Sequence, residues 1–268
     1  MSHPETMANR VLDKVQILVP EDLLLLENIV WARRGRVVEE PLDGAEAQLL
    51  LIPGKRAIIT ISSKITNRQR KRFSITHELG HMEMHRNEIK VNLCTRDDIS
   101  DRGKVTKYDL EQEANQFASF FLMPERFVKE YCQDVENSMD AIQKVAGRFD
   151  VSLTAAALRY IDFMSEPVAV VFSRSGRIEW FKSTQDFLDM DVFVNVGEAV
   201  GSDTLAGRIF RGLAVPDRWQ QARVSDWFRK GDYRRDAMIK EWSFNMMNYE
   251  TVMSILWIDE DIYDDSWD

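Results

Sequence analysis

The segment His77-Glu78-Leu79-Gly80-His81 constrains the fold of this 268-residue chain more than any other. Residues four apart lie on the same face of an α-helix, so a helix here aims the His77 and His81 imidazoles at one point. Three of the chain's four histidines fall within nine residues around this segment. The sequence therefore predicts a metal site on a helix. His77 and His81 are the expected ligands, and Glu78 is placed to act as the base that takes a proton from a metal-bound water.

The helix that carries this motif is expected to run from about Thr66 to Arg86. Thr66 and Gln69 match a capping box, in which two side chains satisfy backbone N–H groups at the start of a helix. No proline interrupts the segment, and Gly80 is its only glycine. Gly80 allows two interpretations: a close approach by another backbone, or a weak position that costs about 1 kcal/mol relative to alanine.

His85 lies on the same helix, and its distance from His77 argues against a shared ion. At a rise of about 1.5 Å per residue the two histidines are about 12 Å apart along the helix axis, whereas metal–nitrogen bonds are about 2 Å long. We expect His85 to contact a ligating residue or to occupy the helix end, with direct ligation as the alternative.

A second helix, around residues 111–118, is expected to supply the third ligand. Glu111, Ala114, Asn115 and Ala118 share one helix face, which places a carboxylate among small residues that suit close packing. Glu113 lies on another side of this helix and is the alternative ligand. Asn115 is placed to hydrogen-bond a ligating histidine and to fix its tautomer. An ordinary amphipathic helix with exposed glutamates is the competing interpretation.

Two motifs follow each other in the chain: H-E-L-G-H-x-x-x-H over His77 to His85, and E-x-E-A-N-x-F-A-x-x-x-L-M-P over Glu111 to Pro124. Together they resemble the ImmA/IrrE family of metallopeptidases. The resemblance implies a zincin-like fold, cytoplasmic residence and a regulatory task. Similar proteins cleave or otherwise inactivate helix-turn-helix repressors of the XRE type, which switches on DNA-damage or mobile-element genes. In related zincins with an E-x-x-A-[N/D] helix the leading glutamate binds the metal, and it corresponds here to Glu111.

The donor set indicates which metal to expect. Two imidazoles and a carboxylate suit Zn²⁺, and Mn²⁺ or Fe²⁺ also accept such ligands.

Two short apolar runs, at Gln48 to Ile52 and Ala57 to Ser63, flank a turn and predict a β-hairpin. In zincin-like peptidases an edge strand beside the active helix holds an extended substrate by strand addition, a general mode of peptide recognition. The residues expected to form this substrate strand are Ile58, Ile59, Thr60, Ile61 and Ser62.

Two further segments near the motif have open roles. The segment Asn87 to Tyr108 is longer than in the family pattern, and a loop of this length is expected to line or cover the cleft. The cations Arg68, Arg70, Lys71 and Arg72 form either a solvated helix face or a docking patch for an acidic partner.

Charge and composition limit the partners. The net charge of −9 argues against direct nucleic-acid binding, because duplex affinity depends on cationic contacts to phosphate. No segment approaches the roughly 20 apolar residues that span a bilayer. The start lacks the pattern of a signal peptide, and Cys94 and Cys132 make no disulfide framework. We therefore expect a cytoplasmic protein without a membrane partner.

The segment Asp140 to Phe163 reads as helix, turn, helix, with Ser152 as the cap of the second helix. It resembles a DNA-binding helix-turn-helix. Its acidic surroundings and the sequence Leu-Thr-Ala-Ala-Ala-Leu, which offers few groups for base edges, favour a packing role.

After Glu166-Pro167 the pattern changes to short strands, at 168–172, 177–181, 241–247 and 251–258, with helices expected at Val196 to Arg211 and Trp219 to Phe228. This part resembles, weakly, a GAF-like sensory domain. Its aromatic residues are expected to form a core, with a ligand pocket as the alternative. They are Trp180, Phe181, Trp219, Trp227, Phe228, Trp242 and Trp257.

The fold class expected for the whole chain is α+β. A zincin-like metallopeptidase core is expected at 1–133, a helix-turn-helix-like segment at 134–165 and a small C-terminal α+β domain at 166–268. The leading hypothesis is a zinc-dependent endopeptidase that cleaves an XRE-type helix-turn-helix repressor. The alternatives are a non-cleaving, metal-stabilised docking module that sequesters a repressor or a toxin-like partner, and a transcription factor that uses residues 140–163.

Overall fold

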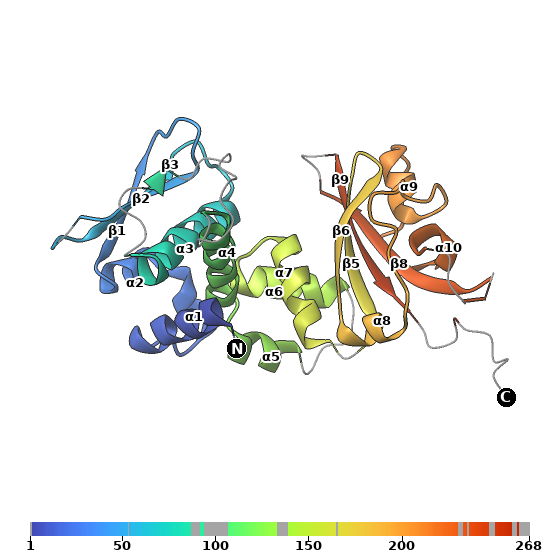
Figure 1. Cartoon of the computed structure of the whole chain (residues 1–268), viewed down its shortest axis with the longest axis horizontal. Coiled ribbons are helices and arrows are strands. Elements are labelled where there is room, and N and C mark those ends of the chain that lie inside the picture. The colour runs from blue at the N-terminus through green and yellow to red at the C-terminus, as the bar shows by residue number, and fades with distance from the viewer. Residues whose placement is uncertain are drawn as a thin grey trace. The chain divides into compact units, whose positions relative to one another are not determined.

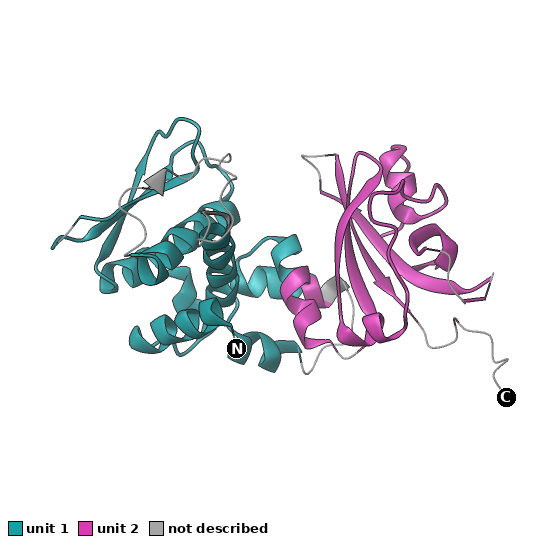
Figure 2. Ribbon diagram, in the orientation of Figure 1, with its two compact units in different colours: residues 1–135, 143–156 teal, residues 136–142, 157–268 magenta. Residues whose placement is uncertain are grey.

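A computed structural model describes residues 2–52, 54–86, 92–93, 107–132, 139–164, 166–229, 233–234, 236–246, 250–258 and 262. The chain is a mixed α+β protein, as predicted, and divides into two compact units (Figures 1 and 2). Unit 1 consists of residues 1–135 and 143–156, and unit 2 of residues 136–142 and 157–268. Within the described part of the chain, no helix is both long and apolar enough to cross a bilayer.

The described residues of unit 1 include a four-stranded sheet in the order β1-β3-β2-β4. The strands are β1 (Gly35–Glu40), β2 (Ala47–Leu50), β3 (Ala57–Ser62) and β4 (Asn92–Leu93). β1 runs parallel to β3, whereas β2 is antiparallel to both β3 and β4. Leu49, Ile59 and Ile61 are at most 1% exposed, which shows that one face of the sheet covers a core.

Helices cover this core. They are α1 (His3–Lys14), α2 (Leu26–Ala32), α3 (Arg68–Met84), α4 (Lys107–Leu122) and α5 (Glu125–Cys132), with a 3₁₀ turn η1 (Pro20–Leu24). α3 contacts β2 and β3 of the sheet and also packs along α4, which in turn contacts α1. α3 therefore joins the sheet to the other helices of unit 1 (Figure 1).

The hairpin expected around residues 48–63 is confirmed by the antiparallel pairing of β2 with β3. The expectation that this second strand lies at an edge is wrong. β3 is paired on both sides. Its whole length, from Ala57 to Ser62, pairs with β1, and its residues from Ile58 to Ile61 pair with β2. β1 was not predicted from the sequence, because a parallel partner that precedes the hairpin has no turn signal beside it.

The helix-turn-helix-like segment forms α6 (Met139–Phe149) and α7 (Leu153–Tyr160), followed by the 3₁₀ turn η2 (Ile161–Phe163). Ser152 caps α7, as predicted: its Oγ accepts a hydrogen bond from the backbone N–H of Ala155 at 3.1 Å. Asp150, between the helices, has φ of +49°, a left-handed conformation that Asp tolerates better than most residues. Val145 and Phe149 are 0% and 1% exposed, so α6 packs an apolar face inside the protein.

Unit 2 is built on an antiparallel sheet whose five described strands follow the order β6-β5-β9-β8-β7. These strands are β5 (Val168–Arg174), β6 (Arg177–Ser183), β7 (Gln220–Arg223), β8 (Met238–Asn245) and β9 (Thr251–Trp257). Ser175 and Gly176, at φ of +47° and +78°, join β5 to β6, and two such positive values are typical of a type I′ hairpin turn. The two hairpins predicted from the sequence are confirmed.

Short helices pack on the sheet of unit 2. They are α8 (Gln185–Asp189), α9 (Leu205–Phe210) and α10 (Val224–Trp227), which contact β5, β8 with β9, and β7, respectively. The helices predicted over 196–211 and 219–228 are wrong in their first halves. Residues Gln220–Arg223 pair with Glu241–Met238 of β8, and Ala199 forms a bridge with Arg177. Pairing with the sheet overrides the helical pattern at these positions.

Four of the aromatic residues named from the sequence lie in two different environments. Trp227 and Phe228 are at most 1% exposed and belong to the main core of this unit, as expected. Trp219 and Trp257 instead line a small apolar cavity together with Tyr160.

Candidate metal centre

Helix α3 carries the H-E-x-x-H motif and begins one residue later than predicted. Asn67, not Thr66, is its N-cap: the Asn67 Oδ1 accepts a hydrogen bond from the backbone N–H of Arg70 at 2.8 Å. Both residues are good caps by type, so the sequence could not distinguish them. From Arg68 to Met84 the helix is uninterrupted, which places the side chains of His77 and His81 on one face.

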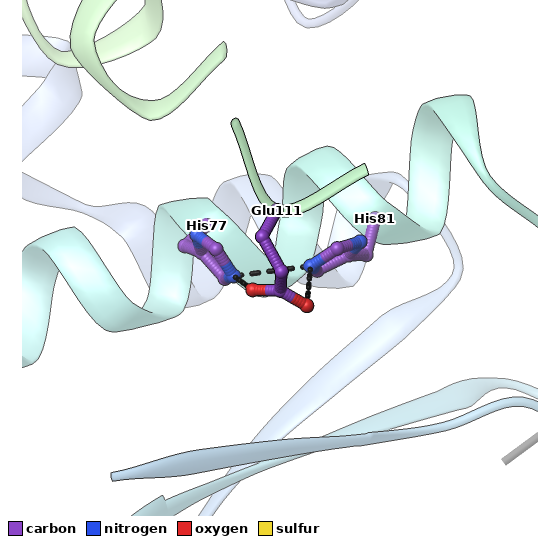
Figure 3. A group of neighbouring side chains, drawn as sticks. All are labelled: His77, His81 and Glu111. Carbon is purple, nitrogen blue, oxygen red and sulfur yellow. Dashed lines mark hydrogen bonds and ion pairs between the residues drawn. The ribbon is translucent and has the colours of Figure 1, made fainter. Parts of the chain in front are cut away.

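His77, His81 and Glu111 converge into one cluster, in which one ligand atom from each residue lies within 4.8 Å of the others (Figure 3). The Nε2 atoms of the two histidines are 3.0 Å apart. Glu111 Oε2 lies 3.1 Å from Nε2 of His77, and Glu111 Oε1 lies 3.4 Å from Nε2 of His81. Ligands about 2.0–2.1 Å from a tetrahedral zinc are about 3.3 Å from one another. The spacing and the chemistry of these donors therefore fit a zinc ion.

A hydrogen bond orients the first histidine. Asn115 Oδ1 lies 3.0 Å from Nδ1 of His77. An amide oxygen only accepts, so Nδ1 of His77 carries a proton, and in the neutral ring Nε2 then presents a lone pair to the cluster. This contact of Asn115 with an expected ligand agrees with the prediction from the sequence.

The three groups of the cluster shift one another's pKa values in different directions. Burial opposes ionisation of Glu111, but hydrogen bonds with His77 and His81 hold the Glu111 pKa well below its usual range. Burial lowers the pKa of His81, and the contact with Glu111 offsets only part of this effect. Burial also acts to lower the pKa of His77, but the hydrogen bond with Glu111 and the charge of Glu78 outweigh it and raise the pKa. The cluster thus combines an anionic carboxylate with a neutral His81.

Close packing of α3 on α4 brings Glu111 to the histidines. A Cβ added at Gly80 would lie 3.0–3.2 Å from ring and Cβ carbons of Phe117, closer than ordinary van der Waals contact. Ala114 and Ala118 of α4 are fully buried. Of the two interpretations of Gly80, the close approach is correct, although a side chain and not a backbone approaches it.

His85 and Glu113, the alternative ligands considered from the sequence, contact each other, and His85 also contacts the far side of the His81 ring. His85 Nδ1 is 2.9 Å from Nδ1 of His81, and His85 Nε2 is 2.9 Å from Oε2 of Glu113. His85 and Glu113 therefore bond to each other, which the sequence analysis did not foresee.

Arg33 is a further residue that the sequence analysis missed. Its Nε and Nη2 donate to the two carboxylate oxygens of Glu83, at 3.0 and 2.7 Å, and so tie the end of α2 to α3 two residues beyond His81. The two residues are 50 positions apart, and no local pattern in the sequence connects them.

The basic cluster on the first turns of α3 is paired within the chain. Arg68 and Arg72 contact Asp150 in the turn between α6 and α7, Arg70 pairs with Glu46, and Lys71 pairs with Glu39. Arg68 and Arg70 nevertheless remain 68% and 42% exposed, so the face is largely solvated, which was one of the two interpretations considered from the sequence. It anchors α3 to its neighbours in unit 1.

Two expectations about the substrate cleft have different outcomes. The substrate strand Ile58 to Ser62 is not available for strand addition, because β3 is the strand between β1 and β2 and pairs with both. The segment Asn87 to Tyr108, expected to line or cover the cleft, lies outside the described residues apart from the backbone of residues 92–93 and 107–108.

Comparison with known proteins agrees with this geometry. Residues 34–160 match the peptidase M78 family model, described as IrrE N-terminal-like domain. The whole fold is similar to that of a solved structure, a Mycobacterium tuberculosis transcriptional regulator. The two share 15% sequence identity at a TM-score of 0.60, over 97% of this chain and 77% of that one. No curated protein matches the sequence. The matched segment contains the whole cluster, and the chain thus carries, over residues 34–160, an IrrE N-terminal-like domain of the ImmA/IrrE family.

Proposed function

We propose that this protein is a cytoplasmic zinc-dependent endopeptidase whose substrate is a helix-turn-helix repressor of the XRE type. The observation that carries the proposal is the convergence of His77, His81 and Glu111, whose ligand atoms have separations close to the edges of a zinc tetrahedron. The family match supports peptidase chemistry. The repressor substrate comes from the family resemblance.

Each residue has a role in this scheme. His77, His81 and Glu111 would hold the ion, which supplies Lewis acidity to a peptide carbonyl and to a water. Glu78 would take the proton from the attacking water and pass it to the leaving amine. Its position supports this role, because it follows His77 directly and its negative charge acts on that ring.

In this proposal unit 1 performs the peptidase reaction and unit 2 senses a signal. Unit 1, with the metal cluster, would correspond to the expected zincin-like core, and it contains residues 143–156 of the helix-turn-helix-like segment. Unit 2, an antiparallel sheet with helices, would be the GAF-like sensory part. We include in this proposal the boundaries at 133 and 165 and the sensory role of the C-terminal part.

The test is a comparison of protein N-termini in cells that express the wild type or Glu78→Ala, before and after DNA damage. We expect a new N-terminus that depends on Glu78 and lies inside a small helix-turn-helix repressor. Loss of a general base lowers turnover by about 10²- to 10⁴-fold, so the new terminus should be undetectable in the variant.

A different outcome would favour the non-cleaving module. If both proteins contain metal, give the same N-termini and support the same damage response, the domain acts by sequestering its partner and the peptidase proposal is wrong.

A further inference from the structure

A chain of hydrogen bonds extends from the metal cluster into α4 on the side of His81 that faces away from Glu111. Nδ1 of His81 lies 2.9 Å from Nδ1 of His85, and Nε2 of His85 lies 2.9 Å from Oε2 of Glu113. The His81 and His85 side chains are 0% and 3% exposed, whereas that of Glu113 is 39% exposed. The chain thus begins at a buried ring and ends at a carboxylate near the surface.

For a neutral His85 beside an ionised Glu113, the two hydrogen bonds allow one arrangement of the protons. A carboxylate only accepts, so Nε2 of His85 carries the proton that Glu113 binds. The other nitrogen of a neutral His85, Nδ1, is then an acceptor and takes the proton on Nδ1 of His81. Nε2 of His81 is left with a lone pair that points at the cluster. The reverse arrangement would place a proton on Nε2 of neutral His81, where it would block a metal ion.

We propose that Glu113 and His85 are positioning residues, which orient the His81 ring and hold it in the tautomer that can bind a metal. This inference rests on the proposed metal site and deepens it. It also gives each histidine its own support from α4: Asn115 holds His77 directly, while Glu113 holds His81 through His85. Partners of this kind typically contribute about 10- to 100-fold to metal affinity.

The backbone favours the same arrangement. His85 is the C-cap of α3, and its N–H donates to the carbonyl of His81 at 2.9 Å. The His85 ring is therefore held one turn from His81 by the helix end itself. Because His85 is almost fully buried, water cannot readily take over its bond to His81.

The experiment measures zinc affinity by competition with a chromophoric chelator in the wild type, His85→Ala, Glu113→Ala and Glu113→Gln. We expect losses of about 10- to 100-fold in His85→Ala and about 10-fold in Glu113→Ala. Glu113→Gln should stay close to the wild type, because its amide oxygen accepts the same hydrogen bond. Glu130→Ala, which removes an exposed carboxylate from α5, is the matched control and should bind zinc as the wild type does.

A second readout reports the tautomer without metal or activity. Long-range ¹H–¹⁵N spectra of the histidine-labelled, metal-free chain should show His81 protonated at Nδ1 in the wild type and a mixture of tautomers in Glu113→Ala. Because Glu113 is partly exposed, this variant is expected to fold even if His85→Ala does not.

The outcomes separate this inference from the function on which it rests. If the wild type binds no zinc, the proposed function fails, and this inference fails with it. If the wild type binds zinc tightly and Glu113→Ala keeps both its affinity and a single His81 tautomer, this inference alone is wrong.

Discussion

Glu111 in unit 1 is half-buried and Glu241 in unit 2 is fully buried, and the neighbours of these two carboxylates differ in kind. Glu111 faces two imidazole nitrogens, at 3.1 and 3.4 Å, in a cluster whose side chains can all offer lone pairs. Glu241 is 1% exposed and faces donors. Its Oε1 accepts from Ala206 N–H at 2.9 Å and from Ser243 Oγ at 2.7 Å, and its Oε2 accepts from Trp227 Nε1 at 3.3 Å.

This difference distinguishes a site from a core. Lone pairs that converge on one point repel one another unless a cation or a proton lies among them, so the Glu111 cluster is arranged for a ligand. The oxygens of Glu241 already accept hydrogen bonds from the protein, and its carboxylate therefore stabilises the fold by joining α9 and α10 to β8.

The largest effects are expected from truncating each carboxylate to alanine, which should affect metal binding in one variant and stability in the other. Glu111→Ala removes an anionic ligand, so we expect its zinc affinity to fall by more than the roughly 10- to 100-fold that loss of an outer hydrogen-bond partner costs. Glu241→Ala should leave zinc affinity unchanged. It should lower the free energy of unfolding by about 1–3 kcal/mol for each buried donor left without an acceptor. Chelator competition and urea denaturation measure the two quantities. A loss of zinc affinity in Glu241→Ala as large as that in Glu111→Ala would contradict the assignment of metal binding to Glu111 and of fold stability to Glu241.

The free energy of unfolding should depend on pH through the ionisation of Glu241. Burial raises the pKa of Glu241 above its ordinary value of 4.5, despite the hydrogen bonds that act in the opposite direction. The folded protein therefore binds this proton more tightly than the unfolded chain. The resulting stabilisation is present below pH 4.5 and is lost as the pH rises through the raised pKa.

Urea denaturation of the wild type and of Glu241→Gln across this range measures that loss. Relative to Glu241→Gln, the wild type should lose at most about 1.4 kcal/mol per pH unit in this window. A difference between the two proteins that is constant with pH would show that Glu241 does not titrate in this way.

Two glycine-to-alanine changes test, with the smallest expected effect, how closely α3 must approach α4. A Cβ at Gly80 would press on Phe117 and separate the helices that bring Glu111 to the histidines. The strain of about 1–3 kcal/mol exceeds the gain of about 1 kcal/mol in helix propensity, so Gly80→Ala should lose up to about 2 kcal/mol of stability together with zinc affinity.

Gly147→Ala in α6 is the control. Among the described residues, no heavy atom beyond its own helix lies within 4 Å of the added Cβ, so this change should stabilise the protein by about 0.5–1 kcal/mol and leave zinc binding unaffected. Equal zinc affinity in both variants would show that the α3–α4 spacing does not control the site.

The parts that the sequence predicted follow from helical periodicity. The spacing of His77 and His81, and the shared face of Glu111 and Asn115, depend only on residues within one helix, and the structure places these four side chains together. The same reasoning separated Glu113 from that face, and Glu113 contacts His85 instead.

The parts that the sequence did not predict depend on pairing between distant segments. No local pattern connects β1 to its parallel partner β3, so the strand at 58–62 was wrongly predicted to lie at an edge. Residues 220–223 have a helical pattern but pair with β8. Glu241 lies in an alternating strand pattern that gave no sign of the donors supplied by Trp227 and α9.

The most direct test measures bound zinc and peptide-bond cleavage in the same samples of wild type, Glu78→Gln and Glu111→Ala, with the substrate found from the N-terminus comparison. We expect one tightly bound zinc per chain in the wild type and in Glu78→Gln, weak or no binding in Glu111→Ala, and cleavage by the wild type alone. Cleavage by Glu78→Gln at the wild-type rate, or full zinc binding by Glu111→Ala, would contradict this expectation.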